Sequence, residues 1–255
     1  MAVAGFDRLY LERLLGKQLS QKDIEERIPM LGCPFEGEEE GKLFFEVFPN
    51  RPDMLGAEGF ARAVKTFLGI TRGLKEYAAS KPAIKLFVDS SVQAIRPHIA
   101  AAVVRDAKLT GSAVESLIQL QEKIDETMGR RRKKVAIGLH DMEKVTPPFT
   151  YKAAGQNEIS FIPLDFSDRM TPAEILERHP KGRLYGGILR GSKTCPVIID
   201  SKGQVLSFPP IINSELTRVT GSTKTLFIDI TGQHEKPLNE ALNIIVTSLA
   251  DAGAR

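Results

Sequence analysis

The feature that most constrains this chain is a polar segment in its first third, residues 71–83, TRGLKEYAASKPA. The segment is rich in small residues and contains a glycine and a proline. This composition suits a linker between two cores, because it offers little apolar surface to bury and interrupts regular structure. We therefore predict two domains, residues 1–80 and 81–255, with the boundary near Ser80.

The part before the linker is predicted to be a small helical domain with a short strand or hairpin. Residues 36–41 are expected to form a turn, and the aromatic and β-branched run KLFFEVF at residues 42–48 is typical of a strand. Polar caps, apolar spacing and terminal glycines predict three helices, at residues 7–16, at residues 20–32 and from Asp53 to Gly69.

The part after the linker alternates between strand and helix signals. Strands are predicted at residues 84–88, 99–104, 135–139, 196–199, 204–206 and 226–230, and helices at 113–128, at 234–252 and from Thr171. The Ser-Lys-Gly sequence at 201–203 is expected to close a hairpin. Strands interleaved with a few helices favour an α+β fold over a doubly wound parallel sheet.

Composition excludes several classes of protein. The chain has 255 residues, 42% hydrophobic and 26% charged, which is ordinary globular composition. A formal net charge of +3 is too small to argue for nucleic acid by itself. The N-terminus lacks a basic leader followed by an apolar core, and no stretch approaches a membrane span. We expect a soluble, cytoplasmic protein that contacts no membrane.

Motifs for cofactors are absent from the sequence. There is no glycine-rich phosphate loop, and the four histidines lie far apart. Two cysteines, Cys33 and Cys195, are too few for a disulfide framework or a thiolate zinc site and are expected to be buried, unreactive side chains. The sequence therefore predicts no metal site and no nucleotide hydrolysis in this chain.

Three groups of residues could carry chemistry. His140 ends the strand of VAIGLHDMEK, where it faces either a pocket or solvent. Asp229 and Thr231 alternate on one strand, so they either line a wet polar site or form the solvent face of that strand. The five adjacent cations at residues 130–134 form either a solvated face or a surface that contacts phosphates.

Three longer motifs carry a resemblance to a known family. They are FPNRPDMLGAEGFARAVKTFLGI (residues 48–70), VAIGLHDMEKVTPPFTY (135–151) and SFPPIINSELTRVTGSTKTLFIDITG (207–232). Together, in this order, they resemble the N-terminal half of the beta subunit of phenylalanyl-tRNA synthetases of the archaeal and eukaryotic type. The match spans essentially the whole chain.

The resemblance implies a proofreading function. Residues 81–255 are expected to be an editing domain that hydrolyses the ester of tyrosine wrongly attached to phenylalanine tRNA, and residues 1–80 a structural domain near the tRNA. The family's beta subunit is longer, so the chain is expected to be a fragment without the later modules. The implied partner is the alpha subunit, which holds the synthetic site, in an α2β2 heterotetramer. The complete synthetase would use ATP and magnesium, whereas this chain is expected to need no cofactor.

The resemblance also implies roles for individual residues. Asp229 is expected to hold or polarise the attacking water, Thr231 and Ser207 to position ester or ribose oxygens, and His140 to shuttle a proton. The residues expected to form the wall and floor of the pocket are Ile198 or Ile199, Pro209, Pro210, Ile211 and Asn213. Those expected to contact the tRNA are Arg130, Arg131, Arg132, Lys133 and Lys134.

Two other functions stay open on the sequence. A non-catalytic scaffold would dock the alpha subunit and guide tRNA, and it would leave tyrosyl-tRNA intact. A generic nucleic-acid binder built on residues 50–67 and 130–134 would bind any duplex with a steep dependence on salt. The small net charge makes the second of these the least favoured reading.

Overall fold

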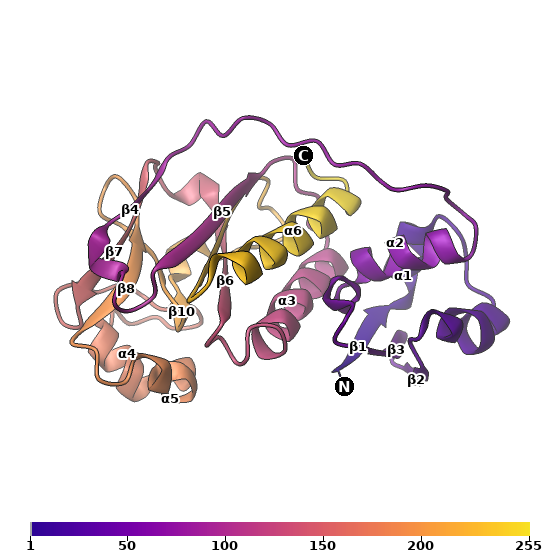
Figure 1. Cartoon of the computed structure of the whole chain (residues 1–255), viewed down its shortest axis with the longest axis horizontal. Helices are drawn as coiled ribbons and strands as arrows, with labels where there is room; N and C mark the ends of the chain where they lie inside the picture. The colour runs from indigo at the N-terminus through magenta and orange to yellow at the C-terminus, as the bar shows by residue number, and fades with distance from the viewer. Residues whose placement is uncertain (1) are drawn as a thin grey trace.

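The computed structural model describes residues 2–255 and shows two parts joined by an extended segment (Figure 1). The first part contains an antiparallel sheet and two α-helices, with short π and 3-10 turns between them. The sheet order is β1 (Ala2–Asp7), β3 (Lys42–Val47) and β2 (Phe35–Glu39), and the helices are α1 (Arg8–Leu15) and α2 (Ala57–Phe67).

The local signals for the first two helical segments are confirmed. The Asp7 side chain accepts a hydrogen bond from a first-turn amide at 2.7 Å, and Gly16 ends α1 with a φ of 69°, a conformation that glycine tolerates best. Ser20 and Asp23 exchange capping hydrogen bonds at the start of the second segment. That segment ends at Gly32, also in the left-handed region.

Two predictions for the first part are wrong. Residues 36–39 belong to the edge strand β2 rather than to a turn, because a run of polar residues there hides the strand alternation. Asp53 does not cap α2: its carboxylate pairs with Arg51 at 2.9 Å and with Arg62 at 3.3 Å, and Gly56 holds the N-cap position. Strand β1 was not predicted at all.

The second part contains two sheets and confirms the predicted α+β class. The three-stranded sheet is antiparallel and runs in the order β5 (His98–Val104), β11 (Leu226–Gly232) and β6 (Val135–Asp141). The five-stranded sheet runs β10 (Ile212–Asn213), β9 (Val205–Phe208), β8 (Thr194–Ile199), β7 (Phe149–Gly155) and β4 (Leu86–Val88). Only the β4–β7 pair is parallel.

Each sheet is covered by its own pair of helices. Buried residues of α3 and α6 pack against the three-stranded sheet, and those of α4 and α5 pack against the five-stranded sheet. These helices are α3 (Gly111–Glu126), α6 (Glu235–Asp251), α4 (Pro172–Arg178) and α5 (Pro180–Tyr185). The predicted capping box at Thr171 and Glu174 starts α4, and Gly203 closes the predicted β8–β9 hairpin. Strands β7 and β10 and helix α5 were not predicted.

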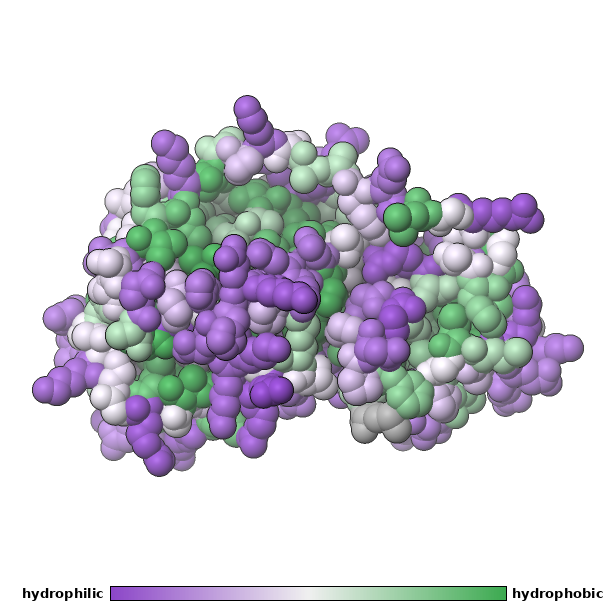
Figure 2. All heavy atoms as spheres, viewed as in Figure 1, coloured by the Kyte–Doolittle hydropathy of each residue, from purple (hydrophilic) through white to green (hydrophobic). Residues whose placement is uncertain are grey.

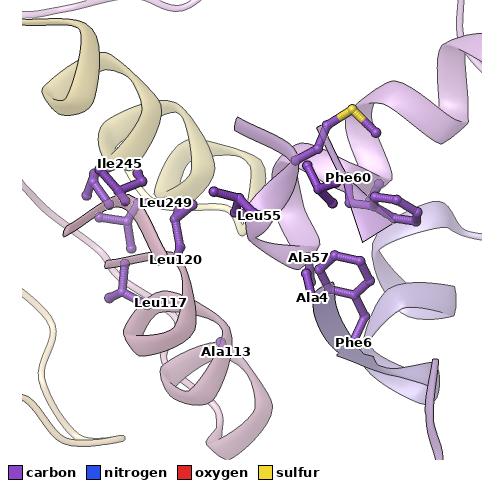
Figure 3. Packing of buried hydrophobic residues seen from close by; sticks show 14 of the residues in the cluster. Ala4, Phe6, Leu55, Ala57, Phe60, Ala113, Leu117, Leu120, Ile245 and Leu249 are labelled. Carbon is purple, nitrogen blue, oxygen red and sulfur yellow. The ribbon is translucent and has the colours of Figure 1, made fainter. Parts of the chain in front are cut away.

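One buried apolar cluster spans both parts of the molecule (Figure 3). It joins Phe6 of β1 to Leu120 of α3 and Ile245 of α6. The buried carboxylate of Glu58 on α2 crosses the same boundary, because it accepts a hydrogen bond from the Ser116 hydroxyl of α3 at 2.8 Å. The two parts therefore share a core.

Residues 71–83 form neither helix nor strand and arch from α2 toward β4 (Figure 1). The segment is tethered partway, because Lys75 Nζ and the Tyr77 hydroxyl bind the Asp251 carboxylate at 2.5 and 2.9 Å. Its irregular backbone agrees with the linker signal, while the domain boundary near Ser80 stays a prediction. Among residues 2–255, no helix combines the length and the apolarity that crossing a bilayer requires.

Candidate functional site

The predicted catalytic residues lie between the two sheets of the second part. Strand β11 is buried on both faces. One face is apolar and packs toward α3 and α6. On the other face, Phe227 packs on Phe149 of β7 with ring centroids 4.4 Å apart, and Asp229 and Thr231 follow at strand spacing. Polar groups buried in this way need hydrogen-bond partners to offset their lost hydration.

The Asp229 carboxylate is held by His140 of β6. The distance from Asp229 Oδ2 to His140 Nε2 is 2.7 Å, and His140 Nδ1 lies 2.8 Å from the Thr217 hydroxyl oxygen. Both ring nitrogens are therefore engaged, and the imidazole orients the carboxylate. No donor among residues 2–255 binds the second oxygen, Asp229 Oδ1, which leaves that oxygen for a water molecule or a substrate.

The position of His140 corrects the sequence analysis. Strand β6 continues to Asp141, so His140 lies inside the strand rather than at its end. Its side chain is fully buried, which makes the surface alternative wrong. A ring enclosed by two protein partners orients its neighbours more readily than it exchanges protons with a bound molecule.

Gly138 provides the space for this carboxylate. It stands opposite Asp229 in the register of β6 and β11. A Cβ atom at this position would lie 2.0 Å from Asp229 Oδ2 and 2.8 Å from His140 Nε2. The site therefore requires glycine because the carboxylate approaches the backbone closely.

Thr231 is held by a buried arginine that precedes β5. Arg96 Nε donates to Thr231 Oγ1 at 2.8 Å, and Arg96 Nη2 donates to the Thr231 carbonyl. Arg96 is 1% exposed, and it forms no ion pair within residues 2–255. Burial lowers the pKa of Arg96 to about 10, so the guanidinium is still charged at neutral pH. A fixed positive charge thus lies behind the polar face of β11.

Ser207 approaches from the other sheet. Its hydroxyl donates to Asn213 Oδ1 at 3.1 Å, and Asn213 Nδ2 donates to the Leu139 carbonyl at 3.2 Å. Because Leu139 directly precedes His140, this chain of hydrogen bonds connects the five-stranded sheet to the edge of β6. Ser207 and Asn213 are therefore placed beside the strand that carries His140.

The residues predicted as wall and floor divide between two apolar clusters. Ile198 packs between the sheets, in the cluster that contains Phe227, whereas Ile199 packs on the side of α4 and α5. Of the two alternatives for the wall, Ile198 is therefore the one that packs between the sheets with Phe227. Pro209 and Pro210 are joined by a cis peptide bond and are buried, and Ile211 packs in the same cluster as Ile199.

The basic run at residues 130–134 forms a tight turn between α3 and β6. Arg130, Arg131 and Arg132 have φ values of 50°, 55° and 65°. Arg130, Arg131 and Lys133 are exposed and Lys134 is half-buried. Figure 2 shows hydrophilic side chains gathered over the region of α6 and α3 on this face of the second part. These four cations are available to a polyanion.

Arg132 differs from its neighbours because its side chain turns into the protein, and its contact with tRNA stays a prediction. Its side chain is only 11% exposed and lies 3.0 Å from Asp125 Oδ2. Nη1 donates to the carbonyls of Pro210 and Ile211, at 3.2 and 2.9 Å, and the guanidinium lies 4.4 Å from the ring centroid of Tyr185. Arg132 therefore braces the cis-proline turn from inside the protein.

Sequence reasoning missed three residues of this site, Arg96, Thr217 and Gly138. Arg96 stands in an irregular loop, where no periodicity marks it, and Thr217 lies in a short 3-10 turn. Gly138 did carry a signal, because a glycine inside a strand often marks the close approach of another group.

The site is closed in this structure. Two described hollows have volumes of about 460 and 430 Å³; one lies between the first part and α3, and the other beside β9. None of the predicted catalytic residues lines either hollow, and Asp229 is 1% exposed. Within residues 2–255, no three His, Cys, Asp or Glu side chains are grouped to hold a metal ion.

Comparisons with known proteins agree on one family, although no model of a protein family matches the chain. The phenylalanine–tRNA ligase beta subunit of Archaeoglobus fulgidus is 50% identical over 245 residues, and that of Methanocaldococcus jannaschii is 48% identical over 245 residues. These matches cover 96% and 94% of this chain but only 44% of each relative. The chain thus spans less than half the length of these relatives.

A solved structure supports the same assignment over the whole chain. It is an N-terminal fragment of the phenylalanyl-tRNA synthetase beta subunit from Pyrococcus horikoshii, with a TM-score of 0.95 and 43% identity. The likeness covers 100% of this chain and 75% of that fragment. The chain therefore belongs to the phenylalanyl-tRNA synthetase beta-subunit family, and it corresponds to the N-terminal region of that subunit.

Proposed function

We propose that this chain is the proofreading part of a phenylalanine–tRNA ligase and hydrolyses the ester of tyrosyl-tRNA made on phenylalanine tRNA. The observation that carries the proposal is the buried Asp229 carboxylate, which is oriented by His140 through one oxygen and unpartnered at the other. An oxygen that no protein donor binds is free to bind a water molecule or a substrate.

The chemistry of the two amino acids makes a second site necessary. A pocket shaped for a phenyl ring rejects an added hydroxyl group imperfectly, whereas a site that hydrogen-bonds the hydroxyl rejects the analogue without it by a large factor. An editing site therefore needs an apolar wall and a polar end. Ile198 and Phe227 supply apolar surface between the sheets, and Phe227 lies on the same face of β11 as Asp229 and Thr231.

Ester hydrolysis asks little of the protein beyond placing water and stabilising charge. We assign Asp229 Oδ1 to the attacking water, from which the carboxylate withdraws a proton as oxygen adds to the ester carbon. Thr231 and Ser207 position the ester or ribose oxygens. His140 holds Asp229 instead of shuttling a proton itself, because both of its ring nitrogens are engaged. The products are tyrosine and tRNA with a free ribose hydroxyl.

The remaining assignments follow from membership in the family. We assign Arg130, Arg131, Lys133 and Lys134 to contacts with the tRNA backbone, since their side chains are not used as braces. The alpha subunit would supply the synthetic site, with ATP and magnesium, in an α2β2 heterotetramer in the cytoplasm. Pro209, Pro210, Ile211 and Asn213 would shape the floor of the editing pocket.

The test is deacylation of tyrosyl-tRNA and phenylalanyl-tRNA, both on phenylalanine tRNA. We expect the wild-type chain to release tyrosine selectively. Asp229→Ala and the isosteric Asp229→Asn should slow release about 100-fold or more, because a positioned base contributes that much to such reactions. Asp23→Asn is the matched control: Asp23 is equally buried but lies in the first part, so its loss should leave the rate unchanged. Normal turnover by Asp229→Asn would contradict the assignment.

A scaffold that docks the alpha subunit and guides tRNA is the second candidate. The closure of the site favours it, because Asp229, Thr231 and His140 are each 1% exposed or less. A scaffold would bind phenylalanine tRNA without releasing tyrosine, and Asp229→Asn would change neither property. Hydrolysis that begins only when the complete synthetase is assembled would instead place the opening of the site under control of the other subunit.

A further inference from the structure

Arg96 is a buried charge that the mechanism above does not use. It is 1% exposed, and two of its nitrogens bind a single residue, Thr231. Burying a guanidinium is expensive unless the charge is compensated. No carboxylate within residues 2–255 forms an ion pair with it. An apolar side chain would fill the same space at lower cost, so the arginine calls for a functional explanation.

The direction of the Arg96–Thr231 hydrogen bond fixes the threonine hydroxyl. Guanidinium nitrogens only donate, so Thr231 Oγ1 is the acceptor in the 2.8 Å contact with Nε. The hydrogen of the hydroxyl must then point to another atom. Within the described part of the chain, no acceptor takes that hydrogen. Thr231 is therefore a donor with an open direction, on the same face of β11 as Asp229.

Arg96 is itself held in place from three sides. The Tyr151 hydroxyl of β7 donates to the Arg96 carbonyl at 2.8 Å. Arg96 Nη1 donates to the Lys133 carbonyl at 3.4 Å, and the fork of Nε and Nη2 grips Thr231. The backbone of Arg96 is thus anchored to β7, and its guanidinium is anchored to the basic turn and to β11, which leaves little freedom to rotate, as orienting a hydroxyl requires.

We infer that Arg96 is a positioning residue of the editing site, which sets the Thr231 hydroxyl as a hydrogen-bond donor to the carbonyl oxygen of the bound ester. The inference rests on the proposed function. When water adds to the ester carbon, the carbonyl electron pair moves onto the oxygen, and a donor aimed at that oxygen stabilises the transition state more than the ground state. The adduct then collapses, the bond to the ribose oxygen breaks, and that oxygen leaves with the proton taken from water.

A double-mutant cycle tests this coupling. Thr231→Val should lower kcat for tyrosyl-tRNA deacylation about 100-fold with little change in KM, in the range seen when one such donor is removed. Arg96→Lys keeps the charge but loses the Nε donor, and it should lower kcat about tenfold. In the Thr231→Val background, Arg96→Lys should change kcat less than about twofold, because its target is already gone. Thr231→Ser should restore most of the rate.

Controls separate the inference from the proposed function and from misfolding. Arg62→Lys alters a half-buried arginine of the first part, which binds Asp53 and Asp251. This variant should leave kcat unchanged. If Arg96→Lys does not fold by circular dichroism, Tyr151→Phe replaces it: loss of the Arg96 anchor should lower kcat about threefold in the wild-type background and not at all with Thr231→Val.

Four results would overturn the inference. Additive losses in the double mutant would show that Arg96 acts independently of Thr231. A rise in KM without a fall in kcat would make Arg96 a binding contact. If Arg96→Lys deacylates at the wild-type rate while Asp229→Asn is inactive, the editing function stands and only the inference fails. Absence of hydrolysis by the wild-type chain, alone and in the complete synthetase, would remove both.

Discussion

The two faces of strand β11 are equally buried and chemically opposite. Leu226, Ile228 and Ile230 pack against α3 and α6, while Asp229 and Thr231 alternate with them and face the other sheet. Burial of the apolar face stabilises the fold through the hydrophobic effect. Burial of the polar face would destabilise the fold without the hydrogen bonds that Arg96 and His140 make with Thr231 and Asp229. A chain selected for stability alone would make both faces apolar. Their difference is therefore a reason to propose that the polar face carries the function.

The largest effect should follow from a change on the apolar face. Ile230 is fully buried, and Ile230→Ala should lower the free energy of unfolding by roughly 2–5 kcal/mol, through lost burial and the cavity left behind. Denaturant unfolding measures this loss. The folded variant should deacylate tyrosyl-tRNA at the wild-type kcat. If kcat fell together with stability, the apolar face would contribute to catalysis as well as to stability, and the proposed division of roles between the two faces would be wrong.

Gly138→Ala should lower both the activity and the stability of the protein. The new Cβ would stand 2.0 Å from Asp229 Oδ2, so the carboxylate must leave His140. We expect kcat to fall about 100-fold, in the range of a displaced general base, with a loss of roughly 1–3 kcal/mol in stability from overpacking. Single-turnover deacylation and thermal unfolding measure the two losses.

Gly187→Ala is the matched control for this change. Gly187 has ordinary backbone geometry, and no atom lies within 4 Å of a Cβ placed there. Its substitution should alter neither kcat nor stability by a measurable amount. If Gly138→Ala retained full activity, the observed position of Asp229 could not be the reactive one.

The apolar face of β11 was easier to predict from the sequence than the polar face. Alternating residues at 226–230 indicate a strand, and Asp229 and Thr231 stand two residues apart, on one face of that strand. Whether that pair faces solvent or a buried site depends on the second sheet, which covers it. The sequence after Pro148 carries no clear strand pattern, so strand β7 of that sheet was not predicted. Arg96 lies well over 100 residues before Thr231 in the chain, and such long-range partners leave no periodic trace.

The same limit explains why the sequence does not show that Arg132 turns inward. Five adjacent cations give no hint which one turns inward, because the left-handed turn at residues 130–132 and the carbonyls of Pro210 and Ile211 decide it. Local features were more reliable: the caps at Asp7 and Thr171 are both present. Propensity and capping act within a few residues, whereas the site is assembled by tertiary contacts.

Asp23 sharpens the comparison, because it is a buried aspartate with a structural role. Burial alone would raise its pKa, but hydrogen bonds from Lys17 and Ser20 outweigh that effect and lower the pKa of Asp23 to about 2. The stabilisation is present above the ordinary value of 3.8 and is lost as pH falls through 2. It should amount to about 1–2 kcal/mol, since Lys17 is exposed to solvent.

Asp23→Asn should therefore remove part of the stability at pH 7 and flatten its decline between pH 4 and pH 2. Denaturant unfolding across this range measures the change. Deacylation at pH 7 should stay at the wild-type rate. If Asp23→Asn slowed deacylation, a buried aspartate in the first part of the molecule would affect catalysis. Burial and polarity alone would then not single out the polar face of β11.

The smallest effect concerns the basic turn beside the site, where exposed and buried arginines adjoin. Arg131→Gln should weaken tRNA binding modestly and reduce the slope of log Kd against log salt by about 1, because one phosphate contact is lost. Arg132→Gln should leave that slope unchanged and lower the melting temperature, since Arg132 braces Pro210 and Ile211. Equal slopes for both variants would mean that the exposed cations of this turn do not meet the tRNA backbone, and that tRNA reaches the polar face of β11 from another side.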